Sequence, residues 1–130
     1  MSTYYLAVDG GGTKTEVICA DESGSVVGRG ISGPTNLTST SVGAASFNLI
    51  EAVRQAVETL PRENSTFACL AMGLAGIDSP KEEYEAEQIF TRALSHYAIS
   101  KFILVNDSII ALKNGSSAQN AVVVIAGTGS

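Results

Sequence analysis

A glycine-rich stretch near the N-terminus, Val8 to Thr15 (VDGGGTKT), carries residue types that bind phosphate. Consecutive glycines let backbone amides converge on one anion, because no Cβ blocks a ligand's approach or keeps the backbone from positive φ. The hydroxyl of Thr13 and the ammonium of Lys14 add donors, and the carboxylate of Asp9 suits magnesium or its waters. The stretch therefore predicts a site for a metal-bound phosphate chain.

This pattern differs from two well-known glycine loops. A P-loop has Gly-Lys-Ser/Thr at the start of a helix, whereas here Thr13 separates Gly12 from Lys14. Thr15 occupies the last glycine position of a dinucleotide-binding fingerprint, and the TEVICA that follows alternates as a strand does. A hairpin turn without a ligand would explain the glycines alone, but not Asp9, Thr13 and Lys14 beside them.

Composition limits the classes of protein and partner. A chain of 130 residues with 45% hydrophobic residues forms one globular domain with its own core. A net charge of −5 argues against nucleic acid or an anionic membrane as partner. No apolar run approaches the roughly 18 residues of a membrane span, and no cationic segment precedes the first apolar run. We therefore expect a soluble, cytoplasmic protein.

The cysteines and the histidine favour structural roles. Cys19 and Cys69 each stand alone in an apolar stretch typical of a strand, so we expect buried thiols and not metal ligands or a disulfide. His96 lies at the polar end of a predicted helix without a Cys or carboxylate at ligand spacing, and we expect it at the surface.

The first half of the chain predicts three strands and a helix. YYLAV forms a strand that ends at Asp9, and TEVICA and SVVGRGI form a hairpin joined by the turn formers of residues 21–24. These would be adjacent antiparallel strands. A polar loop, Ser32 to Thr40, precedes apolar residues at helical spacing from Ser41 to Leu60, and Pro61 would stop that helix.

The second half alternates buried strands with helices. The apolar run Phe67 to Gly76 predicts a central strand covered on both faces, ending in a glycine loop. Ser79 to Glu82 predicts a capped helix start, and the helix should continue to about Tyr97. Lys101 to Asp107 predicts a second buried strand. SIIALKNG then predicts a short helix, and NAVVVIAGTGS a third buried strand that runs into a glycine loop.

These elements predict an α/β fold with a mixed five-stranded sheet, three N-terminal antiparallel strands and helices on both faces. Such sheets bind ligands at the carboxyl ends of their strands. Four stretches fall at strand ends and would meet at one rim: Asp9, the loop of residues 73–76, Asp107, and the loop of residues 127–130.

Five motifs in this order, DGGGTKT, PTN, GLAGID, VNDS and IAGTGS, span nearly the whole chain. Together they resemble the N-terminal domain of the N-acetylglucosamine kinase and BadF/BadG-type ATPase family, in the actin-like ATPase superfamily with a ribonuclease-H-like fold. The resemblance implies ATP and Mg²⁺ as cofactors and an amino sugar as substrate. It assigns Asp9 to the magnesium environment, Asn36 to sugar hydroxyls and Asp107 to the catalytic base. It assigns to the ATP phosphates Gly10, Gly11, Gly12, Thr13, Lys14, Gly127, Thr128 and Gly129.

The implied role of Asp107 is chemically reasonable. A sugar hydroxyl loses its proton as it attacks the γ-phosphoryl group, and a positioned carboxylate can accept that proton. Asp107 could instead cap the helix predicted after it. Both roles are compatible, because a cap uses one carboxylate oxygen and leaves the other available.

Two departures from the family pattern shape the functional expectation. The family's kinases continue into a second domain that binds adenine and closes over the sugar, and this chain ends at Ser130. We therefore expect residues 1–130 to be the N-terminal half of an amino-sugar kinase, with little activity alone and an apolar surface that favours self-association, including a homodimer. The family's activase branch holds an iron–sulfur cluster on cysteines that have no counterpart here. An ATPase that acts on a partner protein and a binding-only module remain alternatives.

Overall fold

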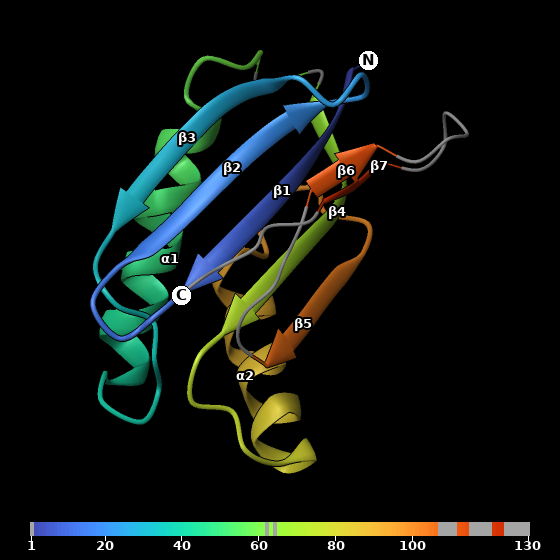
Figure 1. Cartoon of the computed structure of the whole chain (residues 1–130). Helices are drawn as coiled ribbons and strands as arrows, with labels where there is room; N and C mark the ends of the chain where they lie inside the picture. The colour runs from blue at the N-terminus through green and yellow to red at the C-terminus, as the bar shows by residue number, and fades with distance from the viewer. Residues whose placement is uncertain (1, 62, 64, 107–111, 115–120, 124–130) are drawn as a thin grey trace.

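The computed structural model describes residues 2–61, 63, 65–106, 112–114 and 121–123. They form a five-stranded sheet in the order β3-β2-β1-β4-β5, two helices and a small two-stranded sheet (Figure 1). The elements are β1 (Ser2–Gly10), β2 (Thr15–Asp21), β3 (Val26–Ser32), α1 (Val42–Val57), β4 (Ser65–Leu74), α2 (Pro80–Ala93), β5 (Phe102–Asn106), β6 (Leu112–Asn114) and β7 (Ala121–Val123).

The large sheet has the predicted mixed direction. β2 runs antiparallel to β1 and to β3, whereas β4 runs parallel to β1 and to β5. The β2–β3 hairpin turns where the sequence predicts it: Oδ1 of Asp21 accepts hydrogen bonds from the backbone N–H groups of Ser23 and Ser25. Gly24 takes the left-handed conformation, with φ of 91°, that the turn requires.

The main core lies between the sheet and both helices. Leu6, Val8 and Leu70 from the sheet pack in one buried cluster with Leu49 and Val53 of α1 and with two residues of α2, Ala86 and Phe90. Both helices therefore cover the same face, and both lie behind the sheet in Figure 1. The sequence predicts helices on both faces, but the part of the chain that the structure describes has none on the second face, where β7 contacts β1.

Helix starts agree with the sequence, and helix ends are earlier than expected. Ser41 caps α1, and at α2 Ser79 Oγ accepts from the N–H of Glu82, whose carboxylate in turn accepts from the N–H of Asp78. The predicted capped start of α2 is confirmed, although the Glu82 carboxylate bonds the residue before the N-cap and not Ser79 itself. α1 ends at Val57 in a tighter turn, since Glu58 keeps helical dihedral angles but its N–H donates to the carbonyl of Gln55, three residues back. α2 ends at Ala93 because Leu94, with φ of −103° and ψ of 21°, leaves helical geometry.

The C-terminal elements differ from the sequence expectation. Most of the short helix predicted in SIIALKNG lies outside the described residues, but Leu112–Asn114 forms a strand and not the end of a helix. The strand predicted in NAVVVIAGTGS is present as Ala121–Val123 and pairs antiparallel with β6, outside the five-stranded sheet. Pairing of two segments close in sequence closes a shorter loop than joining a distant strand would, and it costs less entropy.

Burial corrects two further expectations. In β5, Leu104 is buried, but Ile103 and Val105 are 37% and 38% exposed, so the strand is covered mainly on the helix face. β5 is the edge strand of the described sheet, which explains this asymmetry. Cys69 is half-buried rather than buried, whereas Cys19 is fully buried as predicted.

His96 is exposed, as expected, and its ring stacks beside Tyr97. Neither of the described helices has the length and apolar character needed to cross a bilayer.

Candidate active site

The carboxyl ends of β1, β4 and β5 meet at one edge of the sheet. The parallel registers align Gly10 with Leu74, and Leu74 with Asn106. The chain leaves β4 next to the glycine turn, because the N–H of Ala75 donates to the carbonyl of Gly10 over 3.0 Å. Asp107 follows Asn106 directly and lies outside the described residues. Two of the four predicted strand-end stretches, Asp9 and the loop of residues 73–76, thus have described residues at this edge, whereas Asp107 and the loop of residues 127–130 lie outside the described residues.

The glycine turn connects β1 to β2 as a tight hairpin. The N–H of Gly11 donates to the carbonyl of Lys14 over 3.0 Å. Gly12, Thr13 and Lys14 are exposed, so their backbone and side chains are accessible to a ligand. The described glycines with positive φ are Gly24 and Gly76, so the turn does not use the left-handed conformation that the sequence reading allowed for.

Gly10 is required for a different reason, which is close packing. A Cβ on Gly10 would lie 2.3 Å from Oγ1 of Thr35 and 3.2 Å from Cδ1 of Leu74. The missing side chain lets the Thr35 loop pack directly against the end of β1. Gly12 is the opposite case: a Cβ there would have 3.9 Å to its nearest neighbour, Nδ2 of Asn36. The space beside Gly12 is open except for that amide.

A buried pair of hydroxyls fixes the loop that carries Asn36. Oγ1 of Thr15 and Oγ1 of Thr35 lie 2.9 Å apart, and both residues are fully buried. The N–H of Thr35 also donates to the carbonyl of Gly11 over 3.2 Å. Asn48 of α1 supports the same loop from behind, since its Nδ2 donates to the carbonyl of Pro34 over 2.8 Å.

Asn36 lies between two glycines of separate loops. A Cβ on Gly76, whose φ is +86°, would lie 2.7 Å from Oδ1 of Asn36, and Nδ2 lies near Gly12. Oδ1 accepts hydrogen bonds from the backbone N–H of Thr38 at 2.9 Å and from its hydroxyl at 2.7 Å. The glycine turn, the PTN loop and the GLAG loop therefore meet around one amide.

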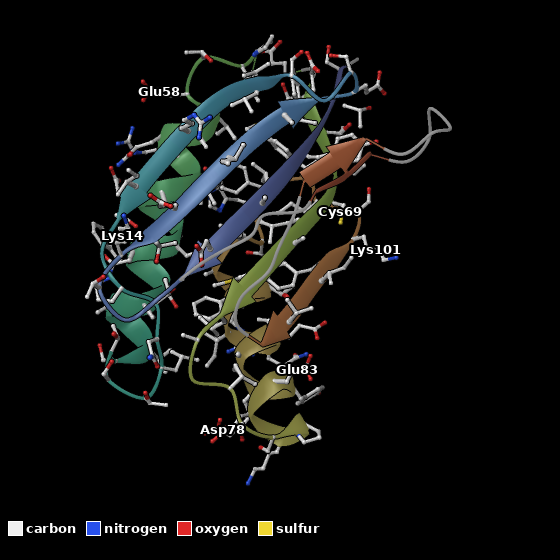
Figure 2. The ribbon with its side chains drawn as sticks, in the orientation of Figure 1. Lys14, Glu58, Cys69, Asp78, Glu83 and Lys101 are labelled. Atoms are coloured by element: carbon white, nitrogen blue, oxygen red, sulfur yellow. The ribbon has the colours of Figure 1, made fainter. Side chains whose placement is uncertain are left out.

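Charged side chains lie on the second face at this edge. Asp9 is opposite Glu16 across the β1–β2 register and opposite Gly73 across the β1–β4 register. Nζ of Lys14 lies 3.3 Å from Oε2 of Glu16 in a solvent-exposed ion pair. An exposed pair contributes at most about 1 kcal/mol, so a phosphate could displace Glu16 from the ammonium. Figure 2 shows Lys14 at the surface, with Asp78 and Glu58 toward opposite ends of the molecule.

Sequence reasoning missed Thr35 and Glu16. Lys14, the last residue before β2, is two residues from Glu16, a spacing that places side chains on one face of an extended chain and so indicates their pairing. No sequence signal indicates that Thr35 would be buried against Thr15. The remaining predicted site residues, Gly127 to Gly129 with Thr128 among them, lie outside the described residues, as Asp107 does. Within residues 2–106, apart from 62 and 64, no group of His, Cys, Asp and Glu is arranged to hold a metal by itself.

The family comparison covers almost the whole chain. The BadF/BadG/BcrA/BcrD ATPase family matches residues 6–130, which include the glycine turn, the Asn36 loop and the ends of β4 and β5. The chain belongs to this family. The predicted family resemblance is therefore confirmed.

Two curated relatives that are similar to this family member are named as sugar kinases. The N-acetylmuramic acid/N-acetylglucosamine kinase of Clostridium acetobutylicum is 29% identical over 127 residues, covering 98% of this chain and 40% of the relative. The N-acetyl-D-glucosamine kinase of Dictyostelium discoideum is 27% identical over 133 residues, covering 96% of this chain and 41% of the relative. The chain thus spans about two fifths of the length of these relatives.

A solved structure shows the same fold. A protein of Chromobacterium violaceum, described as a candidate N-acetylglucosamine kinase, superposes with a TM-score of 0.60 at 18% identity, over 79% of this chain and 34% of that one. At this identity the likeness concerns the fold alone. It confirms the predicted α/β, ribonuclease-H-like architecture of this BadF/BadG-type family member.

Proposed function

We propose that this chain is the N-terminal, phosphate- and sugar-binding half of an ATP-dependent amino-sugar kinase. The observation that carries the proposal is the meeting of the glycine turn, the Asn36 amide and the GLAG loop at the carboxyl edge of β1, β4 and β5. The kinase relatives, which act on N-acetylglucosamine by name, support this substrate class. A further domain that binds adenine is part of the proposal.

The residues present fit a magnesium-bound triphosphate. Exposed Gly12, Thr13 and Lys14 offer an accessible turn with an ammonium, and Asp9 supplies a carboxylate at the end of β1, just before that turn. When bound, Mg²⁺–ATP supplies the phosphoryl group. Under the proposal, Asp9 binds the metal or its waters and Gly10 to Lys14 hold the phosphates on this side. Gly127, Thr128 and Gly129 hold them from the second loop.

The remaining roles concern the sugar. Asn36 binds the acceptor sugar beside the phosphate turn, and Asp107, one residue beyond the aligned end of β5, accepts the proton of the attacking hydroxyl. Because phosphoryl transfer depends mainly on positioning, fixing the sugar loop against the glycine turn is the main contribution of the described residues.

The test is sugar-dependent ADP release by the full-length protein, with N-acetylglucosamine, glucosamine and N-acetylmuramic acid as acceptors and glucose as a neutral comparison. We expect at least one amino sugar to raise ADP release well above the rate with ATP alone and to yield a sugar phosphate. Phosphorylation of no hexosamine and no hexose would refute the proposal. ATP hydrolysis independent of any sugar would instead support an ATPase that acts on a partner, which the family's description as ATPases keeps as the second candidate. Cytoplasmic location and self-association stay predictions.

A further inference from the structure

The Asn36 side chain has a chemically fixed orientation. A backbone N–H can only donate, so the Asn36 atom 2.9 Å from the N–H of Thr38 must be the amide oxygen. The Thr38 hydroxyl donates to the same oxygen over 2.7 Å. This oxygen is therefore committed within the loop, and the opposite atom of the amide must be the NH₂ group.

The NH₂ group faces the site. Nδ2 of Asn36 is the atom nearest to the open side of Gly12, in the turn proposed to hold phosphate. Among the described residues, the hydrogen bonds of the Asn36 side chain are the two that Thr38 donates to Oδ1, and neither involves Nδ2. An amide held in this way offers a bound ligand two donors and no acceptor.

We propose that Thr38 is a positioning residue that makes Asn36 a hydrogen-bond donor toward the substrate, so that the sugar presents an acceptor to it, a hydroxyl lone pair or an acyl carbonyl. The proposal rests on the proposed kinase function and refines its sugar site. Without the Thr38 hydroxyl, only the backbone N–H of Thr38 holds the amide oxygen, so rotating the amide to expose its oxygen costs one hydrogen bond instead of two. Discrimination between acceptor and donor groups on the sugar then falls.

The test uses two substitutions of nearly equal shape in the full-length protein. Thr38→Val removes the hydroxyl but keeps the branched side chain and the backbone N–H, whereas Thr38→Ser keeps the hydroxyl. Loss of one hydrogen bond that orders the amide predicts about a fivefold lower kcat/KM for the sugar in Thr38→Val, through KM. We expect Thr38→Ser to stay within twofold of wild type, and KM for ATP to be unchanged in both. Thr40→Val is the matched control, since Thr40 bonds only the backbone carbonyl of Asn36 through its N–H.

A double-mutant cycle with Asn36→Ala separates positioning from an independent effect. If Thr38 acts through Asn36, Thr38→Val has no further effect on sugar kcat/KM in the Asn36→Ala background. Wild-type kinetics in Thr38→Val, or an equal loss in both backgrounds, would overturn the proposal. Both results require that the wild-type protein phosphorylates the sugar. Failure of the wild type to do so counts against the kinase function itself, and direct sugar binding to wild type and Thr38→Val then tests the positioning role.

Discussion

Replacing Thr35 with valine tests whether the buried hydroxyl pair holds the Asn36 loop against the glycine turn. Valine has nearly the shape of threonine, so the change removes a hydroxyl without creating a cavity. Thr15 and Thr35 are both fully buried and their oxygens lie 2.9 Å apart, so Thr35→Val leaves the Thr15 hydroxyl without its partner. An unpaired buried hydroxyl costs about 1–3 kcal/mol, and we expect a loss of about 2 kcal/mol in the free energy of unfolding.

Equilibrium urea unfolding of the chain measures this loss, with Thr15→Val and the double variant as the remaining corners of the cycle. Removing both hydroxyls leaves none unpaired, so the double variant should be less destabilised than the sum of the two single variants by at least about 1 kcal/mol. Ser39→Ala, an exposed change in the same loop, is the control and should lie within about 0.5 kcal/mol of wild type. A Thr35→Val variant as stable as wild type, or strictly additive losses, would refute the reasoning.

Three further predictions concern a glycine, an ion pair and a thiol. Gly76→Ala forces a Cβ to within 2.7 Å of Oδ1 of Asn36 at φ of +86°; we expect about 1–2 kcal/mol of destabilisation in urea unfolding and weaker sugar binding by calorimetry. The hydrogen bond from Arg54 lowers the pKa of Glu51 from 4.5 to about 2, so its stabilising contribution is present above pH 4.5 and is lost as pH falls toward 2. Glu51→Gln should therefore flatten the fall in melting temperature over that range, and an unchanged slope would contradict this. Burial, with a smaller effect of a nearby carboxylate, raises the pKa of Cys19 to about 12, so iodoacetamide at pH 8 should label this thiol only after urea unfolds the chain.

The sequence predicts best where local chemistry decides the structure. The Asp21 turn, the cap formed by Ser79 and Glu82, and the strand-end position of the glycine turn each follow from a few adjacent residues. The meeting of β1, β4 and β5 at one edge also follows, because consecutive parallel strands in an α/β fold share their carboxyl edge.

Features that depend on distant contacts were not predictable in the same way. The close approach of Gly10 to Thr35, and that of Gly12 and Gly76 to the Asn36 amide, exist only once the loops are packed. Helical spacing indicated α1 and α2 but could not state that both cover the same face, since periodicity defines an apolar stripe and not its partner. Pairing of Leu112–Asn114 with β7 overrides the weak helical pattern at that position.

The central claim, that this edge of the sheet transfers a phosphoryl group to a sugar, is tested most directly by Asp107→Asn in the full-length protein. Asparagine keeps the size of the side chain but cannot accept the proton of the attacking hydroxyl. We expect amino-sugar phosphorylation to fall by at least about a hundredfold, the usual contribution of a general base, while the dissociation constant for the sugar changes little. Turnover equal to that of the wild type would contradict the account.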